Sequence, residues 1–209
     1  MEQKISEILK EEIQNSEYPV VGAKYNNEYK NLDDLVKPEG NIELIDINSK
    51  EGMKIYRRTL TYIMGMAFWY TYPQAHIMVD YQLSNAMYCT IDNMEVTTEM
   101  LENVKVKMRE IIEKDFKIEK RTMSREEAEK FFAKNNTSKG RLQLDLEEKQ
   151  EINMSFCEDY FNYLYETIAT STGATQIFDL QKYSEGFLMR YPSTKNVREL
   201  PEYKETKKL

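Results

Sequence analysis

Few side chains in this sequence are suited to covalent or acid–base chemistry. The 209 residues include one histidine, His76, and two cysteines, Cys89 and Cys157. A single imidazole excludes most histidine-based catalysis and most zinc sites, which need several nitrogen or sulfur ligands. The thiols fall within strand-like patterns and are predicted to be buried and unreactive. His76 precedes a strand-like segment and is predicted to be an ordinary hydrogen-bonded residue.

One pair of polar side chains lies within an apolar stretch. Arg58 and Tyr62 are four residues apart, so on a helix they share one face. A guanidinium beside a phenol can hold an anion such as a phosphate or a carboxylate. The alternative is structural, with Tyr62 packed and Arg58 paired to a nearby acid. The acids considered as partners are Asp80, Asp92 and Asp159.

The segment that carries this pair, residues 53–72, is predicted to be the central helix. Its apolar positions recur at the spacing of one helix face: Tyr56, Leu60, Ile63, Met64, Ala67 and Phe68. Small and apolar residues also occupy much of the opposite side, which is typical of a helix covered by other elements. Lys54, Arg57 and Arg58 limit the apolar run to roughly fourteen residues, which indicates a buried helix rather than a membrane span.

Local patterns predict further elements on both sides of this helix. Before it we expect a helix over 2–15, strands over 18–25, 28–30 and 41–47, and a helical turn over 31–36. After it we expect a hairpin over 76–91, capped helices over 97–115 and 124–135, and a strand over 116–123. Residues 136–140 resemble a loop, 142–146 have no clear pattern, and 152–164, 175–180 and 186–191 are predicted strands.

Composition narrows the class of protein. The net charge is −7, and the lysines and arginines between residues 105 and 134 alternate with glutamates. Mixed signs at helical spacing indicate a solvated face rather than an RNA-binding track. Two cysteines without a disulfide pattern, and no apolar signal-peptide core, are typical of a cytoplasmic protein without a membrane anchor.

Several segments resemble known families. Residues 84–92 (SNAMYCTID) and 96–132 are similar in order and spacing to threonyl-tRNA synthetases. In that family a TGS domain precedes a second additional domain that edits mischarged tRNA, and the similarity covers about residues 16–165. Residues 55–64, 157–165, 171–180 and 186–193 resemble bacterial uridine-kinase-like nucleoside kinases, which carry the same pair of domains before a P-loop kinase domain.

The resemblance implies an α+β fold and three parts. Residues 1–48 correspond to a TGS-like β-grasp lobe that lacks its first hairpin. Residues 49–193 correspond to an editing-domain-like α+β domain with a long central helix against an antiparallel sheet, and 194–209 to the start of a linker or helix. The sequence contains no GxxxxGK[ST] phosphate-binding loop. Both ends are therefore expected to be truncated relative to the family.

The resemblance also assigns a degenerate cleft. The synthetase editing site uses two histidines one turn apart on the central helix, and a cysteine and a histidine on a later strand. Arg58 and Tyr62 stand at the two helix positions, and Leu164 and Ile168 at the two strand positions. Two aliphatic groups, a guanidinium and a phenol cannot bind zinc or accept a proton from water near neutral pH. No catalytic or metal-binding residue is therefore expected.

The sequence leads to a main functional hypothesis and two alternatives. The main one is a non-catalytic ligand-binding, regulatory or oligomerisation module of a nucleoside kinase, with ATP and magnesium implied only for the absent kinase domain. The first alternative is a relic that binds a tRNA acceptor arm without deacylase activity, and the second is a structural adaptor. An open cleft with Arg58 unpaired favours a ligand, a plugged cleft favours a scaffold, and a continuous basic surface favours RNA.

The missing hairpin predicts a partner surface. Without it, one of the strands at 18–25 and 41–47 is expected to present an unpaired edge and to promote self-association. Alternatively, the helix at residues 5–13 folds over the gap and keeps the chain monomeric.

Overall fold

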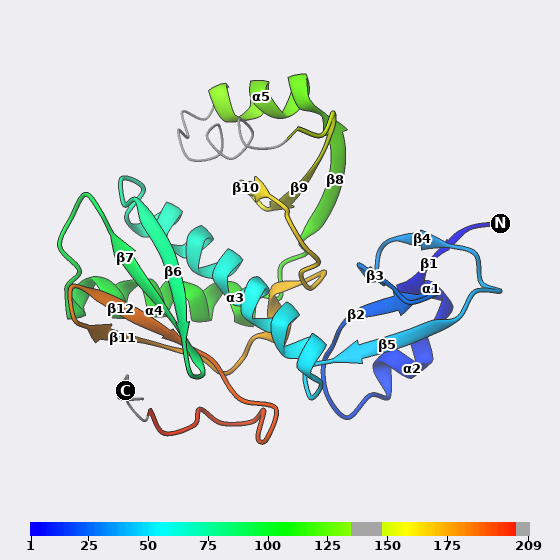
Figure 1. Cartoon of the computed structure of the whole chain (residues 1–209), viewed down its shortest axis with the longest axis horizontal. Helices are drawn as coiled ribbons and strands as arrows, with labels where there is room; N and C mark the ends of the chain where they lie inside the picture. The colour runs from blue at the N-terminus through cyan, green and yellow to red at the C-terminus, as the bar shows by residue number, and fades with distance from the viewer. Residues whose placement is uncertain (135–147, 204–209) are drawn as a thin grey trace.

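The computed structural model describes residues 1–134 and 148–203 (Figure 1). Helices pack against antiparallel sheets, which confirms the predicted α+β class. The long helix α3 runs through the middle of the molecule, between the N-terminal sheet and the larger sheet (Figure 1). The predicted loop at 136–140 and the segment 142–146 lie outside the described residues.

Helix α3, Lys50–Thr71, is the predicted central helix. It begins at the side chain of Ser49, whose hydroxyl accepts a 3.0 Å hydrogen bond from the Gly52 N–H. This cap extends the helix three residues before the predicted start, because it satisfies a backbone donor of the first turn. The predicted apolar face is confirmed, since all six of its side chains are buried.

The N-terminal sheet has the strand order β3-β2-β5, and both pairings are antiparallel. Its strands are β2 (Val20–Tyr25), β3 (Glu28–Lys30) and β5 (Ile42–Asp46). Asn26 and Asn27 form the turn between β2 and β3 at φ values of 48° and 68°, as expected for a tight hairpin. Two short helices, α1 (Ile5–Ile8) and α2 (Lys10–Gln14), precede the sheet. The buried side chain of Ile5 packs with those of Ala23, Leu32 and Val36.

Two predictions for this N-terminal region are wrong. The helix over 2–15 starts only at Ile5 and is divided at Leu9, because β1 (Gln3–Lys4) pairs with β4 (Leu35–Val36). The predicted helical turn over 31–36 is absent. Asn31 Oδ1 accepts from the Asp33 N–H at 2.8 Å, and Asp34 Oδ2 accepts from the Asn31 N–H at 2.9 Å. Such local side-chain bonds compete with helical backbone bonding.

The larger sheet is antiparallel, with the strand order β11-β12-β7-β6. Strands β6 and β7 form the predicted hairpin, while β7 pairs on its other side with β12, so that Cys89 lies opposite Phe187. Helix α4 (Thr98–Glu113) packs along α3 and begins at Thr97, whose hydroxyl accepts from the Met100 N–H. The strand bounds are β6 Ile77–Leu83, β7 Ala86–Ile91, β11 Asp179–Tyr183 and β12 Gly186–Arg190.

A third sheet stands apart from the larger one, at the top of Figure 1. It has the order β10-β9-β8 and is covered by α5, with a small apolar cluster of its own. The predicted capping box at the start of α5 is confirmed, since Ser124 and Glu127 each accept the backbone N–H of the other. Its elements are β8 (Glu119–Ser124), α5 (Arg125–Lys134), β9 (Glu151–Cys157) and β10 (Tyr160–Tyr163).

Two strand predictions near the C-terminal end need correction. Residues 152–164 are a hairpin rather than one strand, because the chain turns at Glu158, where φ is 50°. The strand predicted over 175–180 starts at Asp179, after a 3-10 turn at Thr172–Ala174. The backbone of Ile177 instead bonds a side chain: its N–H and C=O lie 2.9 and 2.5 Å from the Tyr56 hydroxyl.

One apolar core crosses the predicted domain boundary at residue 48. Val21, Ile45 and Ile47 belong to the same buried cluster as the apolar face of α3. Asn31 Nδ2 donates to the Ile168 carbonyl at 3.5 Å, which adds a polar link between the two parts. The division into domains stays a prediction. Over residues 1–134 and 148–203, no helix is long and apolar enough to cross a membrane.

The core predicts a large effect of shortening one side chain on α3. Met64 is 1% exposed, and Met64→Ala should lower the free energy of unfolding by about 2–5 kcal/mol, because it removes apolar contacts and leaves a cavity. Val106→Ala is the control, since Val106 is 63% exposed on α4 and should change stability by less than about 0.5 kcal/mol. Urea denaturation compares the two variants. Equal stabilities would contradict the assigned core face.

Candidate functional site

The structure places three of the four predicted cleft residues in the core and leaves the fourth, Arg58, partly exposed. Arg58 and Tyr62 lie on α3, and Leu164 and Ile168 lie in the segment that follows β10. Tyr62, Leu164 and Ile168 all belong to the main apolar cluster. The Ala169 N–H donates to Thr59 Oγ1 at 2.9 Å, so this segment is also tied to α3 by a buried hydrogen bond.

Aromatic rings fill the place where a cleft was expected. Tyr62 is 7% exposed, and its hydroxyl donates to the Ser155 carbonyl of β9 at 3.3 Å. The ring of Tyr160 packs edge-on against it, with centroids 5.1 Å apart. Gly65 permits this approach, because a Cβ at that position would lie 2.8 Å from the Tyr160 hydroxyl. The side chains of Tyr62 and Tyr160 therefore plug the expected cleft.

The titratable groups around the plug are unsuited to catalysis near neutral pH. Burial, with a smaller contribution from Tyr160, raises the pKa of Tyr62. Burial raises the pKa of Tyr160 to about 12. Burial and the nearby Glu158 raise the pKa of Cys157 to about 12, so its thiol stays protonated and unreactive. None of these side chains can act as a general base or a nucleophile.

Arg58 is paired, as the structural alternative expected, but with a different acid. Its guanidinium lies 2.5 Å from Glu166 Oε2. Partial burial lowers the pKa of Arg58, and Glu166 counteracts this by raising it. The expected pairing with Asp80, Asp92 or Asp159 is wrong. Asp80 accepts from the Thr90 hydroxyl at 2.9 Å, and Asp92 lies 3.3 Å from His76 Nδ1.

The other residues singled out in the sequence have structural roles. The His76 side chain is exposed beside Asp92, and its backbone N–H donates to Asn93 Oδ1, so the prediction of an ordinary hydrogen-bonded residue is confirmed. Cys89 and Cys157 are buried free thiols, also as predicted. Over the described ranges, no three histidine, cysteine or acidic side chains gather as a metal site would require.

The solvent-facing side of α3 carries a different pattern, which the sequence analysis missed. Most of its partly or fully exposed residues recur three or four positions apart along one side, while Tyr70 and Thr71 lie off this line at the end of the helix. We name this line of residues the α3 strip. It consists of Lys50, Glu51, Lys54, Arg57, Arg58, Thr61, Gly65 and Trp69.

The α3 strip is basic at one end and aromatic at the other. Within the described ranges, Lys50 and Lys54 form no ion pair, and Arg57 donates to the neutral Gln82 at 2.6 Å. Trp69 is 37% exposed, with its ring against those of Tyr70 and Tyr160. Cations that can meet phosphates, followed by an exposed aromatic ring, are the features that bind single-stranded nucleic acid.

The basic residues of α4, β8 and α5 do not form such a surface. Lys107 and Lys114 both bond Glu110, at 2.7 and 2.9 Å, and these lysines lower the pKa of Glu110 to about 2. Lys130 bonds Glu126 at 2.7 Å along α5. Most of the cations in this region are offset by neighbouring acids, which agrees with the predicted solvated face. These residues therefore give no reason to place RNA here.

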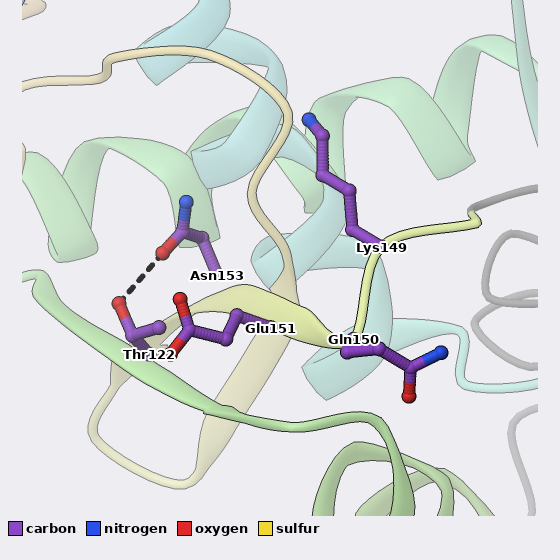
Figure 2. A pocket seen from close by; sticks show the side chains of 5 residues that line it. All are labelled: Thr122, Lys149, Gln150, Glu151 and Asn153. Carbon is purple, nitrogen blue, oxygen red and sulfur yellow. Dashed lines mark hydrogen bonds between the residues drawn. The ribbon is translucent and has the colours of Figure 1, made fainter.

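A shallow hollow lies on β8 and β9, lined by Thr122, Glu151 and Asn153 with the adjoining Lys149 and Gln150 (Figure 2). Thr122 Oγ1 and Asn153 Oδ1 hydrogen-bond to each other across the two strands at 2.7 Å (Figure 2). The predicted cleft residues are not among those lining the hollow. Its polar side chains show no acid–base pair or nucleophile, so it carries no catalytic hypothesis.

Comparison with known proteins gives a consistent relationship. No protein-family model matches the chain. It is 27% identical to the threonine–tRNA ligase of Fusobacterium nucleatum over 164 residues, which are 77% of this chain and 26% of that protein. It is 27% identical to the Acetivibrio thermocellus enzyme over 169 residues, 80% of this chain and 27% of that protein. With the Clostridium tetani enzyme it shares 32% identity over 109 residues, 52% of this chain and 17% of that protein.

The chain is similar to threonyl-tRNA synthetases over most of its length. It spans about a quarter of the first two relatives, as their 26% and 27% shares state. The synthetase resemblance is therefore supported. The relatives named here are not nucleoside kinases, so they give the kinase hypothesis no support and favour the tRNA-related alternative.

The sequence held a signal for the α3 strip that was not used. Lys50, Lys54, Arg57 and Arg58 follow the spacing i, i+4, i+7 and i+8, and Trp69 continues the same side of the helix. In the sequence, Lys54 and Arg57 stand out as interruptions of an apolar run, and basic residues are more frequent between 105 and 134, where acids accompany them.

The buried plug predicts a pH-dependent stability. The pKa of Tyr62 is raised in the folded protein, so above about pH 10 the unfolded chain loses this proton first and unfolding becomes more favourable. The free energy of unfolding should therefore fall as the pH rises from 10 towards 12. Tyr62→Phe should reduce this fall by up to about 1.4 kcal/mol per pH unit. Urea titrations between pH 8 and 12 measure it, and identical slopes for the two proteins would contradict the assignment.

Proposed function

We propose that the chain is a non-hydrolytic module that binds the acceptor arm of a tRNA. The support from relatives is the similarity to threonine–tRNA ligases over 77% and 80% of the chain. The observation on this chain that carries the proposal is the α3 strip, whose cations and aromatic ring lie along one helix. Phosphates would meet the basic end, and an unpaired base would stack on Trp69.

The geometry along α3 matches a short single strand. Lys54 and Trp69 are fifteen residues apart on one helix, which corresponds to about 22 Å at 1.5 Å per residue. Several nucleotides of an unpaired 3′ end can extend over such a distance, with the backbone on the lysines and the terminal base on the indole. Glu166 neutralises Arg58 at 2.5 Å, so Lys50, Lys54 and Arg57 supply the attraction, reduced by the one acid of the strip, Glu51.

Hydrolysis is not part of the proposal because the core occupies the place of chemistry. Tyr62 and Tyr160 fill the position beside α3, and Leu164 and Ile168 are buried aliphatic side chains. Water cannot be activated by these groups, and an ester could not reach them without displacing both rings. The plugged core alone would suit a structural adaptor, and it is the α3 strip beside it that favours binding without turnover. The kinase hypothesis has no comparable support, since the relatives named above are threonine–tRNA ligases.

The plugged site predicts the absence of two activities. The purified chain should bind no stoichiometric zinc and should not deacylate Ser-tRNA or another aminoacyl-tRNA, because the residues at the four assigned positions cannot ligate metal or activate water. Elemental analysis and a deacylation assay measure both, with a no-protein reaction as the control. Hydrolysis above that control would overturn the non-hydrolytic part of the proposal.

The α3 strip predicts a measurable effect of Trp69. A labelled acceptor-arm minihelix with a single-stranded 3′ end should bind the chain, and the same duplex without that end should bind more weakly. Trp69→Ala should weaken binding of the first probe by about 1–3 kcal/mol, because base stacking is lost. It should have little effect on the blunt probe. Equal losses for both probes, or no binding by the wild type, would contradict the proposal.

The basic end predicts a change in salt dependence. Lys54→Gln should reduce the slope of log K against log salt by about one, because one fewer counterion is released. The control is Lys130→Gln, since Lys130 is paired with Glu126 on α5, and its slope should match the wild type. Fluorescence anisotropy over a salt series compares the three proteins. A larger slope change in the control would place the RNA on α5.

A further inference from the structure

The outer edge of β5 is open at Ile42 and Leu44, while the Asp46 carbonyl at its end accepts hydrogen bonds from Ser49. Strand β2 lies between β3 and β5, so β5 ends the N-terminal sheet on one side. The Asn41 carbonyl accepts from the Asn26 N–H at 2.9 Å, and the Ile47 N–H donates to the Pro19 carbonyl at 3.1 Å, so these two residues point towards β2. Because backbone groups alternate along an antiparallel strand, Ile42 and Leu44 point their N–H and C=O groups away from β2.

Three other sheet edges carry features that hinder pairing. Strand β6 is interrupted by a bulge between Val79 and Tyr81, which places the charged Asp80 on the edge. Strand β3 has three residues, and β8 begins with three consecutive charged residues, Glu119, Lys120 and Arg121. Bulges, short strands and charges are the usual protection of an edge. The segment Ile42–Asp46 is longer than β3 and has no bulge of its own.

Apolar side chains accompany the open backbone of β5. Ile42 and Leu44 are half-buried and pack at the margin of the cluster that contains Ile5, Ala23 and Val36. Helices α1 and α2 contribute to that cluster, so they cover one face of the sheet, as the alternative to an exposed lobe expected. The described residues place no strand on the β5 edge, where pairing would complete the cover of both side chains.

We propose that this edge pairs with the same edge of a second copy of the chain, antiparallel about a two-fold axis at Leu44. In that register the outward N–H of each Leu44 donates to the outward C=O of Leu44 in the other copy. Ile42 faces Asp46 and Glu43 faces Ile45 across the axis, so no like charges are directly opposed. The two three-stranded sheets then become one continuous sheet, and Leu44 gains an apolar neighbour in the Leu44 of the other copy.

A second copy suits this edge better than an arbitrary peptide. The strand is compatible with itself about Leu44. Leu44 faces Leu44, and each of the two acids, Glu43 and Asp46, faces an isoleucine rather than another acid. The net charge of −7 on each copy opposes association, so the dimer should strengthen when salt screens this repulsion. The opposite salt dependence is expected for the tRNA complex, which makes the two proposals separable. This dimer does not depend on RNA binding.

The test uses two substitutions at one position. Leu44→Pro removes the outward N–H, which β2 does not use, whereas Leu44→Ala loses the same side-chain packing but keeps the donor. Sedimentation velocity across a concentration series should show a wild-type monomer–dimer equilibrium that tightens between 0.05 and 0.5 M salt. The dimer of Leu44→Pro should be weaker than that of Leu44→Ala by about tenfold or more. Equal dimerisation of the two variants, or a wild-type monomer at every concentration, would overturn the proposal.

Hydrogen exchange supplies a readout that does not depend on the variants folding. In the wild type, the amides of Ile42 and Leu44 should become protected as the concentration rises, while the inward amide of Glu43 should be protected throughout. Amides at Ile42 and Leu44 that exchange rapidly at every concentration would rule out pairing at this edge.

Discussion

The burial of α3 on nearly all sides is the constraint on which the other features depend. The N-terminal sheet contributes Val21 and Ile45 to its cover, the larger sheet contributes Phe187 and Met189, and α4 packs along it. A helix enclosed in this way has little freedom in its sequence, because most substitutions change core volume. The α3 strip is most of what remains accessible, together with Tyr70 and Thr71 at the end of the helix.

The same packing accounts for the chemistry of the molecule. Tyr62 belongs to the core cluster, and the ring of Tyr160 closes over it through the space left by Gly65. The groups that would need to ionise are therefore held neutral by burial, as the raised pKa values of Tyr160 and Cys157 indicate. The same side chains that complete the core therefore also leave no reactive group beside α3. A binding role on the adjoining surface is compatible with that arrangement.

Local patterns in the sequence predicted the elements, and long-range contacts account for the errors. The α3 face, the cap at Thr97 and the capping box at Ser124 depend on neighbours within a few residues, and they were predicted correctly. The Glu166 partner of Arg58 and the bond between Tyr56 and Ile177 join distant segments. No spacing rule reports such pairs. The strip was predictable from helical periodicity, but its exposure depended on knowing which sides of α3 are covered.

The pairing of β7 with β12 sets an order on folding during synthesis. Cys89 meets Phe187 across about a hundred residues of chain, and α4, β8, α5, β9 and β10 all lie between them. The ribosome must release β12 before the larger sheet can close, and until then one side of α3 lacks its cover. The β8–β10 sheet, with its own apolar cluster, can form while the rest waits. A nascent chain of this protein therefore exposes its central apolar helix for several seconds at ordinary rates of translation. During that interval the helix is accessible to chaperones that bind apolar segments.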